Sequence, residues 1–303
     1  MEPHETVTPE TIKQNWAGPD EGDTNPCVKC PRKDEASKAH PYFAVAGSHL
    51  EYTNEGLESA DVTIDELPET TNVMILGEAP GGKTTYNGES RTAKNTPDSV
   101  DMPVGAPDYP LPMYQDGEPI GNVGDWEVFA AQLARHWPTE QHGELGIYYT
   151  NHTKCSDILF EDRNGRVVER GGDHCSQYLL PEVNYVDPDA ILVFSGNRPG
   201  HLRTALSDLG IRMSSSGSIG DAVFNEEKET TGDPEDHPFN VYRPDTLPDT
   251  PVFASYHWQR GMSTVGGRVD DHIYPQQYLT EDLTDTKEKY AAGLAGAVIE
   301  EIP

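Results

Sequence analysis

The chain of 303 residues is long enough to bury one sizeable core, and nothing in its alternation of apolar and helical stretches requires a second domain. Its 22 lysines and arginines stand against 52 aspartates and glutamates, and the resulting formal charge of −30 is spread too evenly for a local acidic interaction tail. Two interpretations remain, a disordered solvating chain or a folded protein adapted to concentrated salt, and recognisable apolar strands favour the second.

The N-terminal residues lack the basic start and apolar run of a secretory signal, and no stretch approaches the roughly 20 apolar residues of a membrane-spanning helix. We therefore expect a soluble, cytoplasmic protein. A monomer is the expected oligomeric state. Without a secretory signal, the four cysteines argue against a disulfide framework, and the close pair Cys27 and Cys30 favours metal binding.

Four short apolar runs, rich in β-branched or aromatic residues and followed by turn residues, read as buried strands. They cover residues 72–76, 147–151, 190–195 and 252–256. Their continuous rather than alternating hydrophobicity predicts a mainly parallel sheet covered by helices on both faces, an α/β architecture.

Helices are predicted between these strands. Asp125 is a suitable N-cap for a helix that carries Trp126, Phe129, Ala130, Leu133 and Trp137 at helical spacing and stops at Pro138. A second helix runs from about Asp173 and is interrupted or kinked at Pro181. A third begins at Pro199 and closes at Gly210, and a C-terminal helix covers about 279–302.

Two stretches show no periodicity. Residues 83–116 are rich in Pro, Gly and Asn, and residues 214–250 run from a Ser/Gly segment into an acidic one. We interpret both as long surface insertions in a single domain that spans residues 1–303.

Residues 77–84, GEAPGGKT, match the phosphate-loop pattern GxxxxGK[ST] letter for letter. A phosphate loop leads directly into a helix whose N-terminus faces the phosphates, yet poor helix formers and prolines follow here. No later apolar strand ends in the Asp that would hold a magnesium ion. A P-loop NTPase is therefore the less favoured alternative.

Several segments instead follow one plan in order along the chain. GEAPG (77–81) follows the first strand, GEPIGNVG (117–124) leads into a helix, TNHTKC (150–155) ends the second strand, AILVFSG (190–196) ends in a glycine, and His257 follows the last strand. This series resembles the iron-sulfur uracil-DNA glycosylases. The resemblance implies a three-layer α/β sandwich around a mainly parallel four-stranded sheet, and a hydrolase of base excision repair that cleaves the N-glycosidic bond of uracil or another damaged base in DNA.

The resemblance also assigns roles to residues. Gly77, Ala79, Ile120 and Asn151 would bind the substrate, and Glu78 and His257 would be catalytic. An Asn amide can pair with uracil O4 and N3–H, a neutral His can donate to the departing base anion, and a Glu can activate the attacking water. The structural alternatives are a loop-capping Asn151, a structural His257 and a loop-stabilising Glu78.

Cys27, Cys30, Cys155 and Cys175 take the positions of the family's cluster ligands. Four thiolates with one close pair can hold a 4Fe–4S cluster, and tetrahedral zinc would use the same set. The family order favours the cluster, in a structural role.

Two family features are changed, since Ile120 replaces a phenylalanine and His257 lacks the Pro-Ser that follows it in the family. Tyr86 or Tyr114 would then have to supply the aromatic face for base stacking. DNA binding would rely on cations such as Arg198, Arg203 and Arg260, because the overall charge repels phosphate. A non-catalytic nucleic-acid-binding or scaffold protein of the same fold is the alternative.

Overall fold

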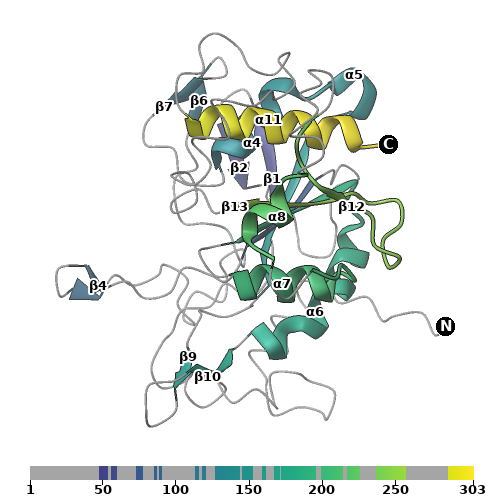
Figure 1. Ribbon diagram of the computed structural model, residues 1–303. Coiled ribbons are helices and arrows are strands. Elements are labelled where there is room, and N and C mark those ends of the chain that lie inside the picture. The colour runs from purple at the N-terminus through teal and green to yellow at the C-terminus, as the bar shows by residue number, and fades with distance from the viewer. Residues whose placement is uncertain are drawn as a thin grey trace.

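A computed structural model of the chain places seven strands in one sheet between two layers of helices (Figure 1). The residues that it describes are 48–53, 56–59, 73–77, 85–86, 89–90, 113–115, 118–120, 127–143, 145–152, 159–161, 167–170, 172–195, 199–213, 217–225, 237–256 and 286–303.

The four strands predicted from the sequence form the centre of this sheet. They are β3 (Val73–Gly77), β8 (Gly146–Asn151), β11 (Ala190–Ser195) and β13 (Val252–Tyr256). Their order is β13-β11-β3-β8, and every neighbouring pair among them is parallel. β3 and β13 are buried along their whole length, as strands covered on both faces must be. The predicted mixed α/β class with a mainly parallel centre is confirmed.

Antiparallel strands extend the sheet at both ends. β12 (Val241–Tyr242) pairs with β13, while β1 (Ser48–Thr53) pairs with β8 and in turn with β2 (Gly56–Ser59). Within the described ranges, three two-stranded ribbons lie outside the sheet. They consist of β4 (Thr85–Tyr86) with β5 (Glu89–Ser90), β6 (Met113–Gln115) with β7 (Glu118–Ile120), and β9 (Leu159–Glu161) with β10 (Val167–Arg170).

One face of the sheet is covered by α6 (Gly172–Val186) and α7 (Pro199–Asp208), which lie below it in Figure 1. The predicted interruption at Pro181 does not occur, because α6 continues through this residue. Buried neighbours on both sides, Leu179 and Val183, anchor the helix and offset the one hydrogen bond that proline cannot donate.

Both helices on this face end in a residue with left-handed backbone. Asp187 adopts φ +48° directly after α6, and Gly210 adopts φ +91° after α7, where a Cβ would meet the Thr246 hydroxyl at 2.9 Å. Aspartate tolerates this conformation and glycine adopts it without steric cost. The predicted boundaries of the third helix, from Pro199 to Gly210, are thereby confirmed.

The opposite face is covered by α4 (Glu127–His136) and α11 (Thr286–Glu301), which contact each other. Phe129, Ala130, Leu133 and Trp137, which the sequence places at helical spacing, are all buried. The rings of Phe129 and Phe194 of β11 meet edge to face. The C-terminal helix begins later than expected, at Thr286, and its residues from Tyr290 to Ile299 are all buried. The short α5 (Thr139–His142) follows α4 and buries none of its residues.

The second expected surface insertion is wrong in part. Its described segments, 217–225 and 237–250, contain α8 (Ile219–Val223) and β12, and they pack against β13. Phe224 and Phe239 are almost fully buried and stack with ring centroids 5.6 Å apart. A capping box at Ser218 and Asp221 starts α8, so local side-chain bonds organise a stretch that lacks hydrophobic periodicity.

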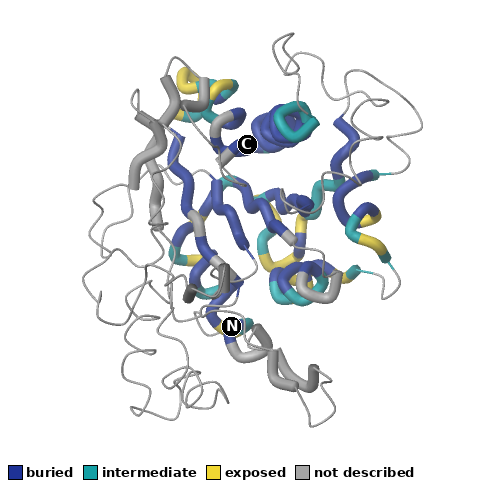
Figure 2. Tube along the Cα trace, turned by 90° about the vertical axis from the view of Figure 1, so that its left-hand side faces the viewer, coloured by how far each residue is buried: buried dark blue, intermediate teal, exposed yellow. Residues whose placement is uncertain are grey.

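The central strands and α11 are largely buried (Figure 2), and their apolar residues belong to one hydrophobic core. None of the helices in the described ranges combines the length and the hydropathy that crossing a lipid bilayer requires. Of the first expected insertion, 83–116, the structure describes 85–86, 89–90 and 113–115, and the rest lies outside the described residues. The extent of the single domain, 1–303, stays a prediction.

Candidate functional site at the carboxyl edge of the sheet

The carboxyl ends of the four parallel strands meet at one edge of the sheet. Gly77 at the end of β3 lies in register with Asn151 at the end of β8, and Ser195 of β11 lies in register with Tyr256 of β13. The backbone N–H of His152 donates to the carbonyl of Gly77 across 2.9 Å. Segments that are far apart in the sequence, GEAPG and TNHTKC, are therefore joined where they leave the sheet. Open α/β sheets bind ligands at this edge.

Of the predicted site residues that are described, Gly77 and Asn151 fall on this edge, whereas Ile120 lies in a ribbon outside the sheet. Gly77 is the buried last residue of β3, Asn151 is the last residue of β8, and Ile120 ends β7 in a ribbon paired with β6. Glu78 and Ala79 come directly after β3 and His257 directly after β13, and all three lie outside the described residues. Gly77 and Asn151 are thus brought together by the register of the sheet.

Beneath Asn151, β8 presents polar side chains on one face at every second position. The hydroxyls of Tyr148 and Thr150 both donate to one carboxyl oxygen, Oε1 of Glu182 in α6, each across 2.9 Å. Tyr148 and Thr150 are 1% exposed and Glu182 is fully buried. Burying a carboxyl group is costly unless hydrogen bonds compensate it, and these two donors do so.

His152, directly after β8, continues this row. It is fully buried, and its Nε2 lies 2.7 Å from Oδ2 of Asp208, at the end of α7. Its backbone N–H is bonded to Gly77, so His152 connects β3, β8 and α7. We call Tyr148, Thr150 and His152, together with Glu182 and Asp208, the polar row.

The polar row is absent from the predicted site. One signal in the sequence marks it, a charged residue among apolar positions of a helix. Glu182 falls between buried Leu179 and Val186 on the inward side of a helix. The partner acids come from helices 30 and more positions away, so no local pattern links them to the strand.

The end of β13 is supported differently. The Tyr290 hydroxyl of α11 lies 3.1 Å from the Ser255 hydroxyl, and the backbone N–H of Tyr256 donates to it across 3.4 Å. Burial raises the pKa of Tyr290 above its ordinary value, while the bonds to Ser255 and Tyr256 act in the opposite direction. A neutral phenol therefore holds the strand that leads into His257.

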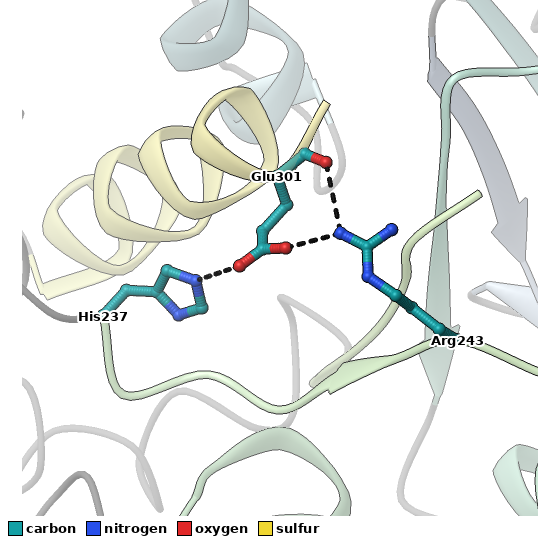
Figure 3. Close-up of polar contacts among 3 residues, drawn as sticks. All are labelled: His237, Arg243 and Glu301. Carbon is teal, nitrogen blue, oxygen red and sulfur yellow. Dashed lines mark hydrogen bonds and ion pairs between the residues drawn. The ribbon is translucent and has the colours of Figure 1, made fainter. Parts of the chain in front are cut away.

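A surface ion cluster fastens the last turn of α11 to the segment before β13 (Figure 3). Arg243 donates to Oε2 of Glu301 across 2.7 Å and to the Glu301 backbone carbonyl across 3.5 Å. Buried His237 lies with its Nε2 3.6 Å from Oε1 of the same carboxylate. A cation at a helix C-terminus is electrostatically favourable, so Arg243 offsets the unfavourable placement of Glu301 there.

One of the cations expected near the site has a structural partner. Arg203 of α7 is half-buried and donates to the backbone carbonyl of Gly217, which ties α7 to the start of α8. The side chains of Arg198 and Arg260 lie outside the described residues. Arg203 is therefore better understood as part of the fold than as a phosphate contact.

The phosphate-loop pattern is not followed by a helix. Residues 85–86 and 89–90 form the antiparallel ribbon of β4 and β5 directly after the GKT sequence. A ribbon at this position cannot direct a helix N-terminus at a phosphate. This agrees with a P-loop NTPase being the less favoured alternative. Tyr86 lies in this ribbon and Tyr114 lies in β6, so both tyrosines weighed as stacking partners are in ribbons.

Of the four cysteines, the structure describes Cys175, which is buried in the first turns of α6. Cys27, Cys30 and Cys155 lie outside the described residues. Within the described part of the chain, no group of three or more potential metal ligands is found. The set of four cysteines therefore stays a prediction. A thiol buried on a helix beside the sheet has the surroundings of an unreactive cysteine.

No protein-family model matches the chain, and a comparison with curated proteins finds no significant relative.

Proposed function

We propose that this protein is a DNA glycosylase of the iron-sulfur uracil-DNA glycosylase type, which hydrolyses the N-glycosidic bond of uracil or another damaged base. One observation carries the proposal: the segments expected to form the site leave the sheet side by side, with Gly77 in register with Asn151 and Ser195 in register with Tyr256. The motif order in the sequence supports the same assignment.

In the proposed reaction the target nucleotide is flipped out of the duplex, because the bond to the sugar is inaccessible inside it. Asn151 pairs with O4 and N3–H of the base, Glu78 orients or deprotonates a water that attacks the anomeric carbon, and the C1′–N1 bond breaks. The base leaves as an anion, and His257 stabilises it by donating a hydrogen bond.

The cofactor of this proposal is a 4Fe–4S cluster held by Cys27, Cys30, Cys155 and Cys175, with zinc as the alternative occupant. When bound, it would tie the N-terminal segment to α6 and to the loop after β8. Iron analysis and visible absorbance of the purified protein test this. Iron that wild type retains and Cys155→Ser loses supports the cluster. Zinc that wild type retains and Cys155→Ser loses would instead indicate a zinc site.

Base release is tested with single- and double-stranded oligonucleotides that contain uracil or another damaged base, in molar salt and in dilute buffer. We expect wild type to leave alkali-labile abasic sites. We expect His257→Ala to slow release by about 10²–10³-fold, as the loss of one anion-stabilising donor does elsewhere. Asn184→Ala, an exposed asparagine of α6, is the matched control for Asn151→Ala. Strand binding without base release from any damaged strand would identify a non-catalytic nucleic-acid-binding protein instead.

A further inference from the structure

Glu182 holds the strand on which the proposed base-recognition residue lies. It sits in α6, and its Oε1 accepts hydrogen bonds from Tyr148 and Thr150 of β8, both across 2.9 Å. Thr150 directly precedes Asn151, the last residue of the strand. We propose that Glu182 is a positioning residue, which fixes the carboxyl end of β8 and thereby the location of Asn151. This inference rests on the function proposed above.

The geometry of the two bonds restricts how β8 can move. Tyr148 and Thr150 are two positions apart on one face of the strand, and their hydroxyls converge on a single oxygen atom. If the strand slid along its axis or rotated about it, at least one of these bonds would break. An apolar contact of the same size has no such directional requirement. The carboxyl group therefore specifies a position as well as filling space.

Glu182 also links this strand to the helix that carries Cys175. Cys175 and Glu182 are seven positions apart in α6, which is close to two helical turns, so both lie on the same side of the helix. Both are buried. A displacement of α6 at its cysteine would be transmitted through Glu182 to the end of β8. The proposed metal ligand and the proposed recognition residue are thus connected by one rigid helix and two hydrogen bonds.

The energetic cost of this arrangement points to a role beyond stability. A buried carboxyl group requires partners, and replacing a buried polar network by apolar residues of similar shape often leaves stability unchanged or improves it. Tyr148, Thr150 and Glu182 are all within 1% of complete burial, so an apolar trio would fit the same interior. The hydrogen bonds supply a defined geometry that such a trio would lack.

A series of four variants separates positioning from stability. Glu182→Leu removes the acceptor, Glu182→Gln keeps an acceptor oxygen, Tyr148→Phe removes one donor, and the triple variant Tyr148→Phe/Thr150→Val/Glu182→Leu makes the whole site apolar. Tyr242→Phe is the matched control, since its hydroxyl bonds the Ala222 carbonyl across 2.8 Å on β12, at the far edge of the sheet. Thermal midpoint, metal content and kcat/KM for uracil release are measured for each.

We expect the triple variant to regain the thermal midpoint that Glu182→Leu loses, while its kcat/KM stays about 100-fold below wild type, the effect of a displacement of roughly 1 Å. Glu182→Gln should remain close to wild type, and Tyr242→Phe should change kcat/KM little. A triple variant that regains both quantities would show a purely structural role and overturn the inference. Failure of Glu182→Leu to fold leaves the decision to the triple variant and Tyr148→Phe.

The same experiment separates this inference from the proposed function. An active wild type with an equally active triple variant overturns the role of Glu182 alone. A wild type without base release overturns the glycosylase assignment, and the positioning role fails with it.

Discussion

On the face of the sheet covered by α6 and α7, the acids Glu182 and Asp208 bond Tyr148 and Thr150 of β8 and His152 directly after it. On the face covered by α4 and α11, the packing is mainly apolar, with polar contacts at the Tyr290 hydroxyl and, at the end of α11, between Glu301 and Arg243. Apolar packing contributes stability and tolerates small shifts, whereas directional bonds to carboxyl groups define where a strand end lies. The apolar face should therefore dominate stability, and the polar face should dominate the geometry of the site.

The largest loss of stability is expected on the apolar face, from Phe129→Ala. Phe129 is fully buried and its ring meets the ring of Phe194 edge to face. Truncation to alanine removes this ring contact and leaves a cavity in the core. We expect the free energy of unfolding to fall by about 3–5 kcal/mol. Urea denaturation in molar salt measures it.

Phe129→Leu is the control for Phe129→Ala, because it keeps most of the volume and should regain a large part of this stability. A loss below about 1 kcal/mol for Phe129→Ala would mean that the α4 layer contributes less than its burial indicates.

A smaller loss is expected on the polar face from Asp208→Ala. Nε2 of fully buried His152 would lose an acceptor 2.7 Å away, and an imidazole without that bond costs about 1–3 kcal/mol. Asp249→Ala is the control, because Asp249 lies in an exposed turn and its loss removes the same charge from a chain that carries −30. The difference in unfolding free energy between the two variants therefore reports the His152–Asp208 pair alone. Equal unfolding free energies for these variants would remove Asp208 from the polar row.

The sequence predicts the two faces unequally. The four central strands and most of α4, α7 and α11 follow from apolar runs, helical spacing and cap residues, because these signals are local. Thr150 and His152 belong to the segment read as a motif, yet nothing near them in the sequence indicates Glu182 or Asp208. Their pairing depends on how α6 and α7 pack against β8. The continuity of α6 through Pro181 also depends on that packing, which outweighs the local rule.

The second insertion shows the converse error. Residues 214–250 have a polar, glycine-containing composition, and the expected surface location follows from it. Phe224 and Phe239 are nevertheless buried, since two isolated aromatic residues suffice to anchor a segment whose remainder is polar. A count of hydrophobic periodicity cannot detect a pair that is 15 positions apart and meets only in the fold.

Tyr290→Phe removes a polar atom from the apolar face. We expect the free energy of unfolding to fall by about 1 kcal/mol, because the Tyr290 hydroxyl contacts Ser255 and Tyr256. The pH dependence gives a sharper signature. Burial raises the pKa of Tyr290 above 10.0, so the folded chain holds the phenolic proton more tightly than the unfolded chain does. Its contribution is complete below pH 10 and is lost as the pH rises above that value, at about 1.4 kcal/mol per pH unit.

Unfolding free energies of wild type and Tyr290→Phe, measured from pH 8 to pH 11, test this. The variant should lose stability less steeply than wild type above pH 10. If the two plots of unfolding free energy against pH ran parallel, Tyr290 would not cause the loss of stability above pH 10. Tyr242→Phe would then be measured in the same way, since burial also raises the pKa of Tyr242.

The smallest effect is expected from Arg243→Gln at the end of α11. The side chains of Arg243 and Glu301 are 43% and 29% exposed, so the pair contributes about 0.2–1 kcal/mol in dilute buffer. Screening over roughly 3 Å in molar salt should reduce this difference further. Denaturation of both proteins at low and high salt measures it. A loss that persists in molar salt would show that the bond to the Glu301 carbonyl, rather than the ion pair, fastens α11, and the apolar face would then also depend on a directional contact.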